Sequence, residues 1–147
     1  MVLDSDEIGG PKHPRSPIQP PAGGRAGVIG PRRYGRQILY RIITDREPRL
    51  SDFYSDKASG EEPGYTQREF PELCESLSMW DDARYATTRA AVRGKRVVRI
   101  IVPAAATAHD VAVHSTPNAE HHVDVWAAPS RLLSMARNVL PDRAQRR

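Results

Sequence analysis

One stretch decides the fold: Arg96-Val97-Val98-Arg99-Ile100-Ile101-Val102, followed at once by Pro103. Five of its seven residues are Val or Ile. Side chains branched at Cβ are stiff at χ1 and pack well on the pleated surface of a sheet. Proline has no amide hydrogen and cannot continue a strand ladder. The stretch therefore predicts a strand over residues 96–102.

A second strand is predicted upstream, over Gln37-Ile38-Leu39-Tyr40-Arg41-Ile42-Ile43-Thr44. Its apolar residues fall on both faces, which is typical of a central strand. A helix is predicted between the two strands, over residues 82–93, with Asp81 as its N-cap and Gly94 just past its end. The small residues of this helix recur at helical spacing and would let it approach a sheet closely.

Shorter signals complete the expected element order. A helix over residues 52–58 would be capped by Ser51, and a further helix would cover residues 66–76. Leu77–Trp80 reads as a short strand, and Ala104–Ala108 as a connector. A final helix would open at Pro129 and run to residue 140, because Leu132, Leu133, Ala136, Val139 and Leu140 form one apolar stripe.

Between the connector and the final helix, the sequence predicts a β-hairpin. Its strands would be Asp110–His114 and His121–Trp126. Register in a hairpin should gather the apolar residues on one face. Pairing Val113 with Val123, and Val111 with Val125, achieves this. The same register would place His114 opposite His122 and Ala112 opposite Asp124.

The second face of this hairpin would carry His114, His122, Asp110 and Asp124 beside Trp126. Three interpretations fit such a face. It could be the solvated side of a half-exposed sheet, a polar active-site cleft, or a metal site. The spacing of its histidines and carboxylates matches no standard zinc signature.

These elements predict an α+β fold: a single small domain over residues 36–141, with a mixed or antiparallel sheet packed by two or more helices. Residues 1–35 hold seven of the ten glycines and six of the thirteen prolines, without a periodic apolar pattern. We expect this Gly/Pro/Arg-rich tail to be disordered. Residues 142–147 form a short basic tail.

The net charge of +4 invites a nucleic-acid interpretation. Divided along the chain, it lies at the two ends, and residues 36–141 carry 14 basic and 14 acidic side chains. Nucleic-acid binding by the folded domain is therefore the third choice. A single Cys74, no basic-apolar leader and no run long enough to span a bilayer favour a cytoplasmic protein with no membrane partner.

Two residues of the first strand could contact a ligand. Arg41 lies among apolar neighbours, where it must reach solvent, pair with a carboxylate, or bind a phosphate or carboxylate of a ligand. Tyr40 could stack on a ring or simply pack. No Walker loop, GxGxxG, GxSxG or HExxH motif is present.

The layout of Leu39-Tyr40-Arg41-Ile42-Ile43, then Leu77-Ser78-Met79 before an Ala-rich helix, then Glu120 before a late strand, resembles a compact ADP-ribosyltransferase-like toxin domain of the Arg-Ser-Glu type. The resemblance covers residues 38–126. It implies NAD as cofactor, with Arg41 on the dinucleotide phosphates, Ser78 at the nicotinamide ribose and Glu120 at the reacting centre. Asn118-Ala119-Glu120 keeps only the last residue of the family's paired-glutamate motif.

Two functions from different classes therefore remain open. One is an NAD-using toxin or effector, which would act with Arg41, Ser78 and Glu120 and could have an antitoxin as its partner. The other is a non-enzymatic binding or regulatory module that engages a protein partner through its flexible N-terminal tail. For either function, Tyr40, His114 and His122 are the further candidates for cofactor or ligand contact.

Overall fold

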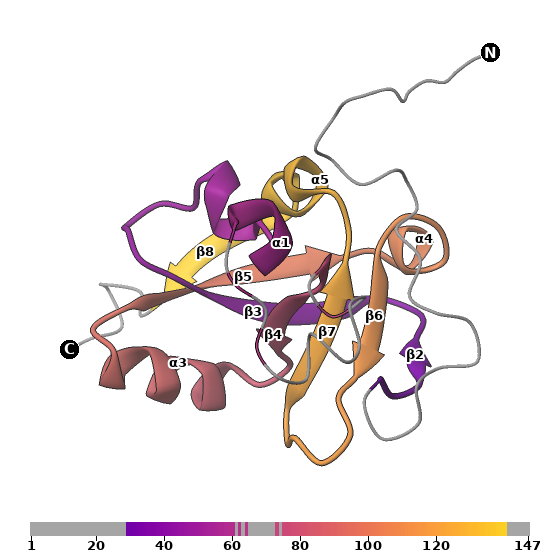
Figure 1. Cartoon of the computed structure of the whole chain (residues 1–147), viewed down its shortest axis with the longest axis horizontal. Helices are drawn as coiled ribbons and strands as arrows, with labels where there is room; N and C mark the ends of the chain where they lie inside the picture. Colours follow the sequence, from indigo (N-terminus) through magenta and orange to yellow (C-terminus); the bar gives the residue numbers. More distant parts are fainter. Residues whose placement is uncertain (1–28, 61, 63, 65–72, 74, 141–147) are drawn as a thin grey trace.

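The computed structural model describes residues 29–60, 62, 64, 73 and 75–140 (Figure 1). Residues 1–28 and the C-terminal tail lie outside the described residues, so the prediction of disorder stays a prediction. Most of the expected helix over residues 66–76, with Cys74, also lies outside them.

The described residues build one seven-stranded antiparallel sheet in the order β2-β6-β7-β4-β3-β5-β8. The strands are β2 (Arg32–Arg33), β3 (Gln37–Ile43), β4 (Leu77–Trp80), β5 (Arg96–Val102), β6 (Ala112–Ser115), β7 (His122–Trp126) and β8 (Ala136–Leu140). The helices are η1 (Leu50–Phe53, 3-10), α1 (Asp56–Ser59), α3 (Ala83–Val92), α4 (Ala104–Thr107) and α5 (Pro129–Ser134). This confirms the α+β prediction, with a purely antiparallel sheet.

The sheet has a packed core on each face. Successive strand residues point to opposite faces, so Leu39 and Ile43 of β3 enter one core, while Tyr40 and Ile42 join the other. Phe53 of η1 and Leu132 of α5 cover the first face. The second face packs against α3, and Figure 1 shows the sheet lying between α3 and the helices α1 and α5.

Helix α3 packs closely because its inner residues are small. Ala86 and Ala90 are fully buried against Trp80 and Val97. The helix is confirmed, but its N-cap is Asp82, whose carboxylate accepts a hydrogen bond of 2.8 Å from the Tyr85 amide. Asp81, the expected cap, contacts other residues described below.

The short helix expected over residues 52–58 is two separate turns. Phe53 is drawn into the core, and the extended Tyr54 ends η1. Ser55, not Ser51, then caps α1 by accepting a 3.2 Å hydrogen bond from the Ala58 amide. Gly60 ends α1 in the left-handed conformation, with φ of 79°.

The final helix is half as long as predicted, because residues 136–140 form β8. After α5, the amide of Ile101 donates to the carbonyl of Met135, and Val139 pairs with Val98. The outer edge of β5 would otherwise expose unpaired backbone groups. Pairing with this edge outweighs the helical spacing of Ala136, Val139 and Leu140.

The hairpin register differs from the prediction by two residues. Val113 pairs with Val125 and His114 with Asp124. The last pair before the turn is Thr116 and His122, since the Thr116 amide donates to the His122 carbonyl. Within the turn, Asn118 and His121 adopt positive φ of 61° and 64°. A slip of two keeps every side chain on its predicted face. Val113, Val123 and Val125 are fully buried in the first core.

The sheet begins before the domain boundary drawn at residue 36. Ile29 is buried, and β2 pairs with β6 through Arg32 and His114. The Gly30 amide donates to the Ser115 carbonyl at 2.9 Å, an approach so close that a Cβ on Gly30 would lie 2.4 Å from that oxygen. Because Arg32 and Arg33 belong to the sheet, the basic charge does not lie wholly at the chain ends.

Candidate functional site

Arg41 fills an interruption in the sheet. Strands β3 and β4 pair only at Tyr40 and Trp80. Next to that pair, Arg41 donates from Nε to the Asp52 carbonyl at 3.0 Å, and from Nη1 to the Ser78 carbonyl at 2.8 Å. Burial lowers the pKa of the guanidinium, while Asp52 and Asp56 act against this effect. The side chain thus ties η1, β3 and β4 together.

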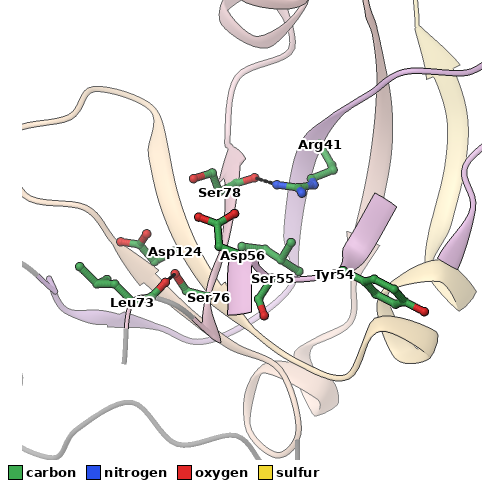
Figure 2. A pocket seen from close by; sticks show the side chains of 9 residues that line it. Arg41, Tyr54, Ser55, Asp56, Leu73, Ser76, Ser78 and Asp124 are labelled. Atoms are coloured by element: carbon green, nitrogen blue, oxygen red, sulfur yellow. Dashed lines mark hydrogen bonds between the residues drawn. The ribbon is translucent and has the colours of Figure 1, made fainter. Parts of the chain in front are cut away.

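A small hollow of about 190 Å³ opens on one side of Arg41 (Figure 2). Its polar lining comes from the loop and helix after η1, from the start of β4 and from β7. Figure 2 shows Asp56 and Ser55 facing this space between Arg41 on one side and Asp124 and Ser76 on the other. Two carboxylates, several hydroxyls and one guanidinium therefore share a small volume.

A larger hollow of about 530 Å³ lies between α3 and the β6–β7 turn. Ile42, Ser78 and Trp80 line it from the sheet. The wall formed by α3 and the turn after it contributes Tyr85, Arg89, Arg93 and Lys95, and the opposite wall contributes Ala119, Glu120 and His122. Arg41 and Ser78 line both hollows, so the two meet at these residues.

The structure places the six candidate residues in two groups. Arg41, Ser78, Glu120 and His122 line the larger hollow together. Tyr40 instead packs in the core beneath α3, and His114 is not among the residues that line either hollow. His114 Nδ1 lies 2.8 Å from the Gly30 carbonyl, and its Nε2 is buried without a hydrogen-bond partner in the described part of the chain.

A polar network joins the hairpin residues. The Thr116 hydroxyl donates to the Asp124 carboxylate at 2.8 Å and lies 2.7 Å from His122 Nδ1. Burial raises the pKa of Asp124, against the effects of Thr116, His122 and His114. Burial lowers the pKa of His122; Asp124 opposes that shift and Arg89 adds to it.

A second set of contacts holds the β6–β7 turn beside α3. His121 Nδ1 lies 3.0 Å from Asp81, and its Nε2 lies 3.6 Å from Glu120. Asp81 also pairs with Arg33 of β2 at 3.0 Å. Burial would raise the pKa of Asp81, but the hydrogen bonds from Arg33 and His121 outweigh it, so that this pKa is lowered. These contacts explain why Asp81 does not cap α3.

Several residues of the site were not identified from the sequence. Arg89 and Arg93 are exposed, and their spacing of four residues places them on the same side of α3 and its C-cap, where both line the larger hollow. Arg89 lies over the rings of Trp80 and Tyr85, 5.8 and 5.6 Å from their centroids. Thr116 carried no signal of its own, because its role depends on the register of the hairpin.

Within the described ranges, no group of three or more His, Cys, Asp and Glu residues could hold a metal ion. No helix of the described residues is long and apolar enough to cross a bilayer. No family model, curated protein or solved structure matches the chain.

Proposed function

We propose that the larger hollow binds a phosphate-bearing nucleotide, with NAD as the first candidate, and that the protein cleaves NAD and transfers or releases its ADP-ribosyl group. One observation carries the proposal. Four cationic side chains, Arg41, Arg89, Arg93 and Lys95, line a single hollow that also contains two aromatic residues and the carboxylate of Glu120. The volume of about 530 Å³ is in the range of small-molecule sites.

The charges suit a pyrophosphate. Guanidinium groups contact phosphate oxygens at two points, which gives the contact geometric specificity as well as energy. Tyr85, which is partly exposed, offers a ring for stacking with a base or a nicotinamide, in the wall where Arg89 lies over it and over the buried Trp80. The hollow therefore offers a dinucleotide both cations for its pyrophosphate and an aromatic ring for stacking.

Glu120 provides the carboxylate for the reaction, and Ser78 lines the same hollow. Cleavage breaks the bond between ribose C1′ and the nicotinamide nitrogen, and the electron pair leaves with nicotinamide. Positive charge then develops on the ribose, as in glycoside hydrolysis, and a carboxylate stabilises it. Glu120 is 78% exposed at its side chain and lines the hollow, so it can approach a bound ligand.

Calorimetric titration with NAD tests binding with two arginine variants, at α3 and at its C-cap, and one control variant on the same helix. Arg89→Ala and Arg93→Ala should each weaken NAD binding about tenfold, since a charge-assisted hydrogen bond contributes about 1.5–3 kcal/mol. Arg84→Ala, a change to an exposed arginine of the same helix that does not line the hollow, should leave affinity within about twofold.

Chromatographic assay of nicotinamide tests the reaction. Glu120→Gln should retain NAD binding and stop nicotinamide release. If the unmodified protein neither binds nor consumes NAD at high protein concentration, the proposal is wrong. If NAD binds and is returned unchanged, the non-enzymatic binding module becomes the better description.

A further inference from the structure

The Thr116 hydroxyl links a buried carboxylate to a histidine of the larger hollow. It donates to Asp124 at 2.8 Å and lies 2.7 Å from His122 Nδ1. Asp124 is only 7% exposed. An ionised carboxylate can only accept hydrogen bonds, and a hydroxyl has one hydrogen to donate. With that hydrogen on Asp124, Thr116 can only accept from His122, so Nδ1 of His122 carries a proton.

A neutral imidazole with its proton on Nδ1 has a lone pair on Nε2. Nε2 of His122 makes no hydrogen bond within the part of the chain that the structure describes. The ring is held edge-on to Trp80, with centroids 5.3 Å apart, and its residue lines the larger hollow. The ring therefore presents an acceptor nitrogen at a site where cations and a carboxylate already gather.

We infer that His122 is the proton acceptor of the larger hollow, and that Thr116 and Asp124 are positioning residues that hold its ring in the required tautomer. The inference rests on the proposed function. As the attacking water or acceptor O–H forms its bond to ribose C1′, its proton passes to Nε2 of His122, and nicotinamide leaves with the electron pair. The imidazolium formed is stabilised by Asp124 through Thr116.

The charges around His122 favour a neutral ring before the reaction. Burial and the nearby Arg89 lower the pKa of His122, against the effect of Asp124. Arg41, Arg93 and Lys95 line the same hollow, and Glu120 is the only carboxylate among the described residues that line it. A base must be unprotonated to act, and this set of charges keeps it so near neutral pH.

His114, on the same sheet face, holds the same tautomer as His122 but differs from it in position. Its Nδ1 also lies against an oxygen, the Gly30 carbonyl at 2.8 Å, so that nitrogen donates and Nε2 is the acceptor. Nε2 of His114 is buried without a partner among the described residues, beside Trp126. Of these two histidines, His122 lines the larger of the two hollows described above, and His114 lines neither of them.

Nitrogen-15 NMR of the full chain at pH 8 tests the tautomer without any nucleotide. His122 should show a protonated Nδ1 and an unprotonated Nε2. Thr116→Val, which removes the hydroxyl and keeps the shape, should give a mixture of tautomers, and Thr116→Ser should restore the single form. Protonation at Nε2 in the unmodified protein, or a tautomer that Thr116→Val leaves unchanged, overturns the inference.

Nicotinamide release tests the role of the base. His122→Gln and Thr116→Val should slow single-turnover release by about 10²–10⁴-fold and about tenfold respectively, with NAD affinity within about threefold. Thr116→Ser and His109→Gln, a change to an exposed histidine outside the hollow, should not slow it. If His122→Gln releases nicotinamide at the rate of the unmodified protein, the role of His122 is overturned and the proposed function is not. Absence of release in the unmodified protein overturns the proposed function, and the role of His122 falls with it.

Discussion

Arg41 occupies a position where an aliphatic side chain would ordinarily be buried. It lies opposite Val98, in a strand that contributes Leu39 and Ile43 to the core. The guanidinium is accommodated because it satisfies two carbonyls, of Asp52 and Ser78, next to the single pair that joins β3 to β4. Arg41 thus links η1 and β4 to β3 and also lines both hollows.

Arg41→Ala should lower the free energy of unfolding by about 2–3 kcal/mol, because the part-buried Asp52 carbonyl and the exposed Ser78 carbonyl both lose their charged donor. Arg41→Lys should recover part of the loss, since one ammonium replaces a guanidinium that reaches two carbonyls. Urea unfolding measures both. Arg137→Ala is the control: among the described residues, this exposed arginine donates only to the nearby Ser134 and Ala136 carbonyls, and its loss should cost under about 0.5 kcal/mol. Equal stability of the Arg41→Ala and Arg137→Ala proteins would contradict this account.

At the scale of elements, the segment after Pro129 shows how pairing overrides local pattern. Helical spacing continues from Leu132 to Leu140, yet the helix ends at Ser134 and β8 follows. Strand β5 lies between β3 and β8, so its outer edge is available only to a segment that arrives there extended. The same apolar residues can satisfy either structure, and the open edge selects the strand.

Two adjacent leucines of α5 provide the test at this scale. Leu132 is fully buried against the first core, whereas Leu133 is partly exposed. Leu132→Ala should cost about 3 kcal/mol, and Leu133→Ala about 1 kcal/mol, because the cost rises with the cavity left behind. Chemical denaturation of the two variants gives the comparison. Similar losses in both would mean that α5 does not present a single face to the sheet.

At the scale of the whole molecule, residues 29–35 join two parts of the sheet that are distant in sequence. Arg33 donates to Ser115 at 2.9 Å and pairs with Asp81 at 3.0 Å. Arg32 donates to the Thr107 carbonyl at 3.0 Å, and the Gly35 amide to the Thr107 hydroxyl at 2.9 Å. These contacts hold the outer edge of the sheet and, through Asp81 and His121, the turn that carries Glu120.

Removal of this segment should therefore weaken the whole domain. A chain that begins at residue 36 should lose about 3 kcal/mol relative to one that begins at residue 29, on the basis of about 0.5–1.5 kcal/mol for each lost hydrogen bond. Thermal unfolding of both chains measures the difference. Equal melting temperatures would restore the boundary at residue 36.

Prediction of the site from sequence was limited by register. Arg41, Ser78 and Glu120 were identified by resemblance, and His122 by its place on a hairpin face. Their common position around one hollow depends on strand order, which periodicity does not contain. Thr116 could not be identified in advance, because the register predicted from the valines placed His122 opposite His114. In the observed register, His114 lies opposite Asp124, and His122 lies opposite Thr116 next to the turn.

Alternating and branched residues by themselves determined which segments form β3, β4, β5 and the hairpin, and which side chains face the core, because a strand has a fixed side-chain period of two. The same local chemistry determined α3 and its glycine end. The tertiary structure decided the order of the strands, the conversion of residues 136–140 from helix to β8, and the inclusion of residues 29–35. Those features depend on hydrogen bonds between strand edges that are far apart in the sequence, and no local pattern specifies which segment will pair with a given edge.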